Sequence, residues 1–217
     1  MEPDNSLEAV GLLVEPVRRA VYEYVAGAAV ERGRDEVAEA VGISRSLAAF
    51  HLDKLVEAGL LAVTYRRRTG RAGPGAGRPA KLYRRAEAEH AVSVPPRTYE
   101  TAAALLAEVV DGAGLEPQLH DAARRAGEKA GASLGDDLLA GLADRGYQPY
   151  RDGEQIRLRN CPFHHLARDY PPLVCGMNLA LLDGLLAAAP SGEQWTARLD
   201  PRPGECCVAL LSKTSSD

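Results

Sequence analysis

The chain has 217 residues, which is enough for one large domain or two small ones. Its hydrophobic fraction of 46% and charged fraction of 26% are typical of a globular protein that buries a core. The longest uncharged stretch, residues 170–182, has 13 residues and two prolines, so we expect no membrane-spanning segment. The first residues, Met-Glu-Pro-Asp, do not form a basic and then apolar leader, and we therefore expect a cytoplasmic protein.

The net charge of −4 does not by itself indicate a nucleic-acid-binding protein, but the charge is unevenly distributed. Residues 44–85 contain 10 lysines and arginines against 2 acidic residues, whereas residues 95–217 contain 12 against 17. A basic block inside an acidic chain indicates a localised surface for a polyanion.

Residues 6–28 carry valines and leucines at three- and four-residue steps, which predicts helix. Pro16 is expected in the first turn of a second helix, where its missing N–H has no cost. A short helix should cover 35–41 and end at Gly42, and Ser44 should cap the next helix, which is expected to run to residue 58.

Two strands are expected at 60–67 and 80–85, on either side of a stretch with four glycines and two prolines. The result would be a long basic hairpin. The order of helix, short helix, glycine turn, capped helix and basic hairpin is that of a winged helix-turn-helix. In such a domain the capped helix enters the major groove and the hairpin contacts phosphates.

The candidate DNA-binding residues lie on the exposed face of this capped helix and on the hairpin. They are Ser44, Arg45, Ser46, Ala49, Phe50, Lys54, Arg66, Arg67, Arg68, Arg71, Arg78 and Lys81. The hydroxyl and guanidinium groups can donate to base edges or phosphates, and the apolar groups can contact a thymine methyl. Asp53 fits badly beside a phosphate, and we expect it either to accept from cytosine or to lie to one side. His51 lies at the edge of the core face, where a packed histidine is expected more than a sensor.

The segment 44–60 contains the pattern His-Leu-x-x-Leu-x-x-Ala-Gly-Leu and resembles the recognition helix of ArsR-like bacterial winged-helix repressors. The resemblance covers roughly residues 6–88. It implies a homodimer that binds double-stranded DNA at a near-palindromic operator.

Val94-Pro-Pro96 is expected to be a linker, after which the composition becomes rich in alanine and leucine. Helices are expected at about 98–111, 116–143 and 175–188, and strands at 155–159, 195–199 and 206–211. The fold class is therefore α+β. We divide the chain into a winged helix-turn-helix domain (1–94), a helical segment for coupling and dimerisation through alanine-rich faces (95–145), and a cysteine-rich sensor domain (146–217).

All four cysteines follow residue 160, and disulfides are not expected in the cytosol. Cys161 precedes a proline in a turn, Cys175 is expected to begin a helix, and Cys206 is expected to open a strand, so three thiols from separate elements could converge. Thiolates are ligands for zinc, copper(I) and iron–sulfur clusters. His164 is the first choice for a fourth ligand, and His165 and Cys207 are alternates.

Cys161 and Cys175 are separated by 13 residues, and Cys175 and Cys206 by 30. These spacings, slightly longer here, resemble those of the SufR-type iron–sulfur repressors. The resemblance implies a [4Fe–4S] cluster on Cys161, Cys175 and either Cys206 or Cys207.

We therefore predict a DNA-binding transcription regulator, a repressor, whose operator binding depends on an iron–sulfur cluster. A zinc ion, a thiol–disulfide switch and inert buried cysteines remain alternatives for this site. A small-molecule-responsive regulator with a structural zinc is the alternative function. An enzyme is not expected, because no nucleophile, phosphate-loop or zinc-protease motif accompanies the histidines.

Overall fold

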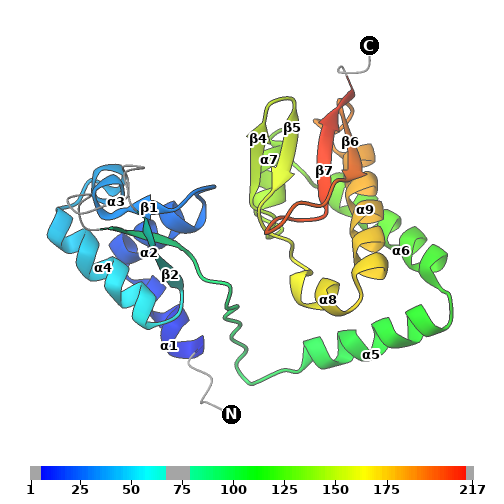
Figure 1. Ribbon diagram of the computed structural model, residues 1–217. Coiled ribbons are helices and arrows are strands. Elements are labelled where there is room, and N and C mark those ends of the chain that lie inside the picture. The colour runs from blue at the N-terminus through cyan, green and yellow to red at the C-terminus, as the bar shows by residue number, and fades with distance from the viewer. Residues whose placement is uncertain (1–5, 67–78, 214–217) are drawn as a thin grey trace. The chain divides into compact units, whose positions relative to one another are not determined.

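The computed structural model describes residues 6–66 and 79–213 (Figure 1). The chain forms two compact units, Met1–Arg97 and Thr98–Asp217, and each is described by itself. The helices that we expected to form a separate coupling segment at 95–145 belong to the second unit.

The first unit consists of a small helical bundle and a three-stranded antiparallel sheet of order β1-β3-β2. Its elements are α1 (Ser6–Gly11), the 3-10 helix η1 (Leu12–Val14), α2 (Pro16–Ala26), β1 (Arg32–Gly33), α3 (Arg34–Val41), α4 (Arg45–Glu57), β2 (Leu61–Arg66) and β3 (Ala80–Arg85).

Local sequence explains where the helices of this unit begin and end. Pro16 is at the start of α2, as expected, and the Glu15 carboxylate caps this helix by accepting from two backbone amides. Gly42 ends α3 with a φ of 72°, a left-handed conformation that favours glycine. Ser44 caps α4 by accepting a 3.2 Å hydrogen bond from the backbone amide of Leu47.

The core of the first unit is formed by the inward faces of α2, α3 and α4 and by the two longer strands. Val21, Val37, Leu52 and Leu55 are fully buried, and Tyr83 of β3 packs against the same cluster. The register pairs Leu61 with Arg85 and Arg66 with Ala80, so β2 and β3 form the base of the expected hairpin. The stretch 67–78, which includes Arg67, Arg68, Arg71 and Arg78, lies outside the described residues.

The second unit packs helices against a four-stranded antiparallel sheet of order β4-β5-β7-β6. Its elements are α5 (Tyr99–Gly112), α6 (Glu116–Gly131), α7 (Leu138–Ala143), β4 (Pro149–Asp152), β5 (Gln155–Leu158), α8 (His164–Asp169), α9 (Pro171–Ala188), β6 (Trp195–Leu199) and β7 (Val208–Ser212).

Helix α9 is the central element of this unit (Figure 1). Its Leu182, Leu185 and Leu186 join Ile156 and Leu210 of the sheet in one hydrophobic core. Helix α6 packs along the other side of α9 with very close backbone approach. A Cβ added at Gly127 would lie 2.0 Å from the carbonyl oxygen of Leu181.

The small-residue stripe of α6 is therefore used within the chain. Its buried residues, Ala123, Gly127 and Gly131, face α9. The expected dimer contact through alanine-rich faces of the central helices stays a prediction, because on α6 the residues Ala122 and Ala126 lie outside the face covered by α9 and are exposed.

Several boundaries differ from the expectation. The helix expected over 116–143 is interrupted between Gly131 and Leu138, because Asp137 caps a new helix by accepting from the amides of Leu139 and Ala140. Strand β4 was not expected at all, because its four residues begin with a proline and show no clear alternation.

Two cysteines also lie elsewhere in their elements than expected. Helix α9 begins at Pro171, so Cys175 lies in its second turn and is not at the helix start. Strand β7 begins at Val208, so Cys206 lies in the turn before the strand. The expectation that Cys175 begins this helix is therefore wrong.

Helix α9 is long and apolar enough to cross a membrane by length and composition alone, contrary to our estimate from the sequence. It carries the largest share of the core of the second unit, and Asn178 is fully buried within it. These contacts are those of a core helix.

Candidate DNA-binding surface and cysteine site

Helix α4 presents the expected two faces. Ala48, Leu52 and Leu55 are buried, whereas the Phe50 side chain is 51% exposed and lies edge-on to the ring of His51. The other exposed candidates on this helix are Arg45 and Ser46, with Ala49 and Lys54 half-buried. The apolar contacts orient the helix so that its polar face is free for a ligand.

The hydroxyl groups at the start of α4 have local partners. Ser44 Oγ accepts from the Leu47 amide and lies 3.1 Å from Ser46 Oγ. The capping role of Ser44 explains its position, and it leaves the Ser46 hydroxyl as the more available group for a base or phosphate.

The described basic residues of this surface are held by carboxylates. Arg45 forms a two-point contact with Asp35, at 2.6 and 2.9 Å. Lys81 Nζ lies 2.6 Å from Asp53 Oδ1. Of the two expectations for Asp53, the structure therefore favours a position to one side, where Lys81 neutralises it.

Buried His51 lies behind this face, between Arg18 and Glu15. Arg18 Nε donates a 3.4 Å hydrogen bond to His51 Nδ1, while Glu15 Oε2 lies 3.8 Å from the same atom. Burial lowers the pKa of His51, and the positive charge of Arg18 acts in the same direction, whereas Glu15 opposes it. A neutral ring that accepts at Nδ1 agrees with both the hydrogen bond and the lowered pKa, and it matches the expected packed histidine.

The second unit brings the four cysteine side chains together. The neighbouring thiols of Cys161 and Cys207 lower the pKa of Cys206, whereas the thiols of Cys206 and Cys175 raise the pKa of Cys207. The thiols thus lie close enough to influence one another in the order Cys161, Cys206, Cys207, Cys175. Both Cys206 and Cys207 lie at this site. The spacing of the cysteines in the sequence therefore could not decide which of the two is the third ligand.

Backbone contacts hold three segments at this point. The amide of Cys206 donates to Leu158 O at 2.8 Å, which joins the last turn to the end of β5. The carbonyl of Cys207 accepts from the amide of Asp200 at 2.8 Å and closes the connection between β6 and β7. The carbonyl of Cys161 accepts from the amide of His164 at the start of α8.

Asn178 and Tyr147 form a buried polar pair next to these thiols. Asn178 Nδ2 donates a 3.3 Å hydrogen bond to Cys206 Sγ, and Asn178 Oδ1 accepts a 2.6 Å hydrogen bond from the Tyr147 hydroxyl. Burial raises the pKa of Tyr147, and the nearby Cys206 adds to this effect. Sequence reasoning missed this pair, although a lone asparagine within an apolar helix was a usable signal because buried amides need partners.

The thiols are not arranged as a finished metal site. Within 6–66 and 79–213, no group of three or more His, Cys, Asp or Glu side chains is placed so that it could already hold a metal ion. Cys161, Cys175 and Cys207 are half-buried and Cys206 is buried, and all four are free thiols.

The two candidate histidine ligands are placed less favourably. His164 and His165 are exposed on the first turn of α8. His164 contacts a cysteine through the backbone hydrogen bond from its amide to the carbonyl of Cys161.

An ionic network anchors the connection that carries Cys206 and Cys207. Arg157 is 1% exposed and donates to Glu205 Oε2 at 2.7 Å and to the carbonyl of Asp200 at 2.8 Å. The Tyr150 hydroxyl donates to the second oxygen of Glu205 at 2.6 Å. This network fixes both ends of the connection against β4 and β5, and it was not foreseen from the sequence.

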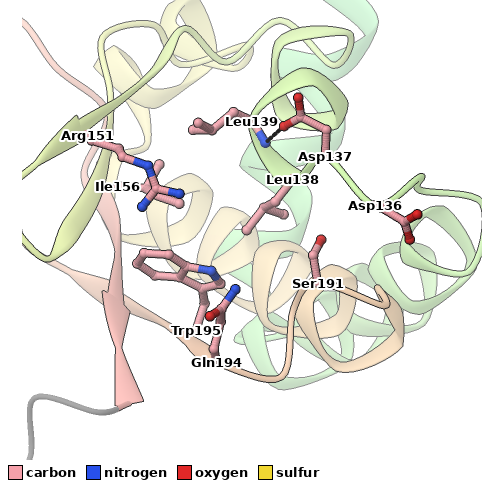
Figure 2. Close-up of a pocket in the computed structure, with 9 residues that line it drawn as sticks. All are labelled: Asp136, Asp137, Leu138, Leu139, Arg151, Ile156, Ser191, Gln194 and Trp195. Atoms are coloured by element: carbon pink, nitrogen blue, oxygen red, sulfur yellow. Dashed lines mark hydrogen bonds between the residues drawn. The ribbon is translucent and has the colours of Figure 1, made fainter.

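A separate pocket of about 330 Å³ opens beside Trp195 (Figure 2). The Arg151 guanidinium lies 5.7 Å from the centroid of the Trp195 ring. The Ser191 hydroxyl is buried and has no hydrogen-bond partner among the described residues. The pocket is lined by Asp136, Asp137, Leu138, Leu139, Arg151, Ile156, Ser191, Gln194 and Trp195.

Comparison with known proteins identifies one part of the chain. Residues 13–64 match a family model described as a helix-turn-helix domain. No curated protein and no solved structure matches the chain. The matched residues contain α2, α3 and α4, so the match indicates a DNA-binding transcription regulator and agrees with the N-terminal fold that the sequence predicted.

Proposed function

We propose that this protein is a transcriptional repressor whose operator binding is controlled by an iron–sulfur cluster held by its C-terminal cysteines. The observation that carries the proposal is the convergence of four thiols, from two turns and one helix, in a chain that also contains a helix-turn-helix domain. All four cysteines are free thiols, and they are therefore available as ligands.

The donor set suits the proposed group. Thiolates are the usual protein ligands of iron–sulfur clusters, and zinc binds the same atoms. When bound, a cluster would give the protein a loaded form, which oxidants or a shortage of iron would convert to the empty form. The thiols would first have to move, because no three candidate ligands among the described residues are placed to hold a metal ion.

The ligand set we propose is Cys161, Cys175 and Cys206, with the fourth position open to His164 or Cys207. The contacts of Cys207 with both Cys206 and Cys175 support Cys207. The exposed position of His164 supports it less, although its backbone contact with Cys161 keeps it within the same turn.

Ligand binding would act on DNA binding through the segments that it joins. A group held by these cysteines would cross-link the end of β5, the second turn of α9 and the turn before β7. Allosteric coupling of this kind typically changes affinity by about 1–3 kcal/mol.

Dimerisation through α5 is the second part of this proposal. Leu105, Leu106 and Val109 are 60, 67 and 64% exposed, and Ala107 is the buried residue of this helix. An exposed apolar helix face of this kind is typical of an interface. A second copy of the chain is the expected occupant, because a palindromic operator needs two recognition helices.

The first experiment is an absorbance spectrum, with iron, sulfide and zinc analysis, of anaerobically purified protein. Visible absorbance with matching iron and sulfide would support the cluster. The Cys161→Ser variant should then lose the bound iron and change operator affinity. The same measurements on the His164→Gln variant show whether His164 is the fourth ligand. Stoichiometric zinc in a colourless protein, or a Cys161→Ser variant with unchanged metal content and operator affinity, would overturn the cluster.

Size-exclusion chromatography with light scattering measures the molar mass of the protein and so tests the dimer. The Leu106→Lys variant should shift the mass toward that of a monomer and weaken operator binding. A monomeric wild-type protein would contradict the α5 interface.

The pocket beside Trp195 favours the second candidate function, a small-molecule-responsive regulator. It has a volume suited to a small ligand, an aromatic wall and a buried hydroxyl that has no hydrogen-bond partner within 6–66 and 79–213. Binding of a small metabolite would change the fluorescence of Trp195, the only tryptophan. A ligand that changes this signal and releases operator DNA from metal-free protein would favour this candidate over the cluster.

A further inference from the structure

Four basic side chains of α4, β2 and β3 form ion pairs with carboxylates of the first unit. They are Arg45, Lys54, Arg66 and Lys81. Arg45 and Asp35 join α4 to α3, and Lys81 and Asp53 join β3 to α4. The other pairs are Arg66 with Glu31 at 3.2 Å and Lys54 with Glu57 at 2.7 Å.

The two closest pairs lie at the surface. The side chains of Arg45 and Asp35 are 66% and 55% exposed, and those of Lys81 and Asp53 are 38% and 52% exposed. A phosphate group could therefore reach each cation. The hydrogen bond with Asp53 raises the pKa of Lys81, so this amine is charged at all physiological pH values.

We propose that Asp35 and Asp53 limit the sequence-independent affinity for DNA, because they hold Arg45 and Lys81 in ion pairs that phosphates must displace. This inference rests on the DNA-binding function. On random DNA the phosphates must compete with the two carboxylates for the same cations. The same competition applies on the operator, where base contacts from α4 add to the binding, so the two carboxylates lower the affinity for any duplex and leave sequence discrimination to the base contacts.

The size of the effect follows from the exposure of the pairs. An exposed ion pair is worth about as much as a two- to fivefold change in affinity. Each cation that moves from a carboxylate to a phosphate should also make the dependence of binding on salt steeper by about 0.9 in a plot of log K against log salt.

The test uses the full chain and a random-sequence duplex of about 30 base pairs, with fluorescence anisotropy measured over a series of KCl concentrations. The Asp35→Asn and Asp53→Asn variants should each bind this duplex about two- to fivefold more tightly, with a steeper salt dependence. Glu39→Gln is the matched control, because Glu39 lies one turn after Asp35 on α3, is exposed, and has no ion pair among the described residues.

A double variant separates this role from a general change of charge. If Asp53 acts through Lys81, then Asp53→Asn should have no effect in a Lys81→Gln background. Equal effects of Asp35→Asn, Asp53→Asn and Glu39→Gln, or full additivity of the Asp53 and Lys81 substitutions, would overturn the inference. Failure of the wild-type protein to bind any duplex at low salt would instead overturn the DNA-binding function itself.

Discussion

The side-chain amide of Asn178 donates a 3.3 Å hydrogen bond to the sulfur of Cys206 and accepts a 2.6 Å hydrogen bond from the Tyr147 hydroxyl. Asn178 is fully buried, and Tyr147 and Cys206 are 2% and 1% exposed. The amide therefore satisfies two groups that have no access to water, and it links α9 to the turn before β7.

Replacement of Asn178 by leucine should destabilise the second unit by about 1–3 kcal/mol, because the buried Tyr147 hydroxyl would lose its acceptor. Urea unfolding followed by the fluorescence of Trp195 measures this change. The Tyr147→Phe variant removes the other partner. The double variant should lose less than the sum of the two single changes, since it leaves no unpaired hydroxyl. Simple additivity would contradict the proposed link.

The close packing of α6 on α9 leads to a second prediction. A Cβ added at Gly184 would lie 2.1 Å from the carbonyl oxygen of Arg124, and a backbone atom cannot move aside as a side chain can. Gly184→Ala should therefore destabilise the second unit by about 1–3 kcal/mol or more. Gly135→Ala is the control, because nothing lies within 4 Å of the added atom and φ is not positive. Its unfolding midpoint should stay the same or rise slightly, and an equal loss in both variants would argue against steric contact as the cause.

Arg157 and Arg202 provide a matched pair for the network that holds the cysteine turn. Arg157 is 1% exposed and binds Glu205 and Asp200, whereas Arg202 is 45% exposed and lies 2.9 Å from Asp152. Arg157→Gln should reduce the free energy of unfolding by about 3 kcal/mol, because it leaves partly buried carboxylates without a counter-charge. Arg202→Gln should cost less than about 1 kcal/mol. Similar losses for the two variants in the same urea titration would contradict this difference.

The same comparison should extend to the thiols. Because Arg157 fixes the connection from Asp200 to Glu205, its loss should make Cys206 and Cys207 react faster with a thiol reagent. Arg202→Gln should leave the rate near that of the wild-type protein. Unchanged reactivity in Arg157→Gln would show that the backbone contacts alone hold the turn.

The N-terminal fold could be predicted because its signals are local. Pro16, Gly42 and Ser44 act on the helix that contains or follows them, and the apolar positions of α4 repeat with the helical period. The contacts of Asp53 with Lys81 could not be predicted, because they depend on how strand β3 lies against helix α4, and 28 residues separate the two side chains.

The C-terminal site was predicted in composition but only partly in geometry. The cysteine positions suggested convergence, and the thiol contacts agree with it, yet the helix start was placed four residues late at Cys175 instead of Pro171. The helix begins with two prolines, which are tolerated in the first turn of a helix. The interruption after Gly131 was missed, although Gly135 and Asp136 have poor helix propensity and Asp137 is a good helix cap.

The pKa of His51 gives a prediction for the stability of the first unit. Burial is the largest cause that lowers this pKa below its ordinary value of 6.5, and the ring accepts a hydrogen bond from Arg18 in its neutral form. The unfolded chain therefore takes up a proton at a higher pH than the folded one. The contribution of His51 to stability should be fully present above about pH 6.5 and should be lost as the pH falls through the lower, folded-state value. Proton NMR titration of the His51 ring gives the pKa directly, and hydrogen exchange of the α4 amides, corrected for intrinsic rates, follows the stability. The His51→Gln variant should show a weaker loss of protection between neutral and mildly acidic pH, and a His51 titration at or above 6.5 would contradict the structural assignment of a neutral, buried ring.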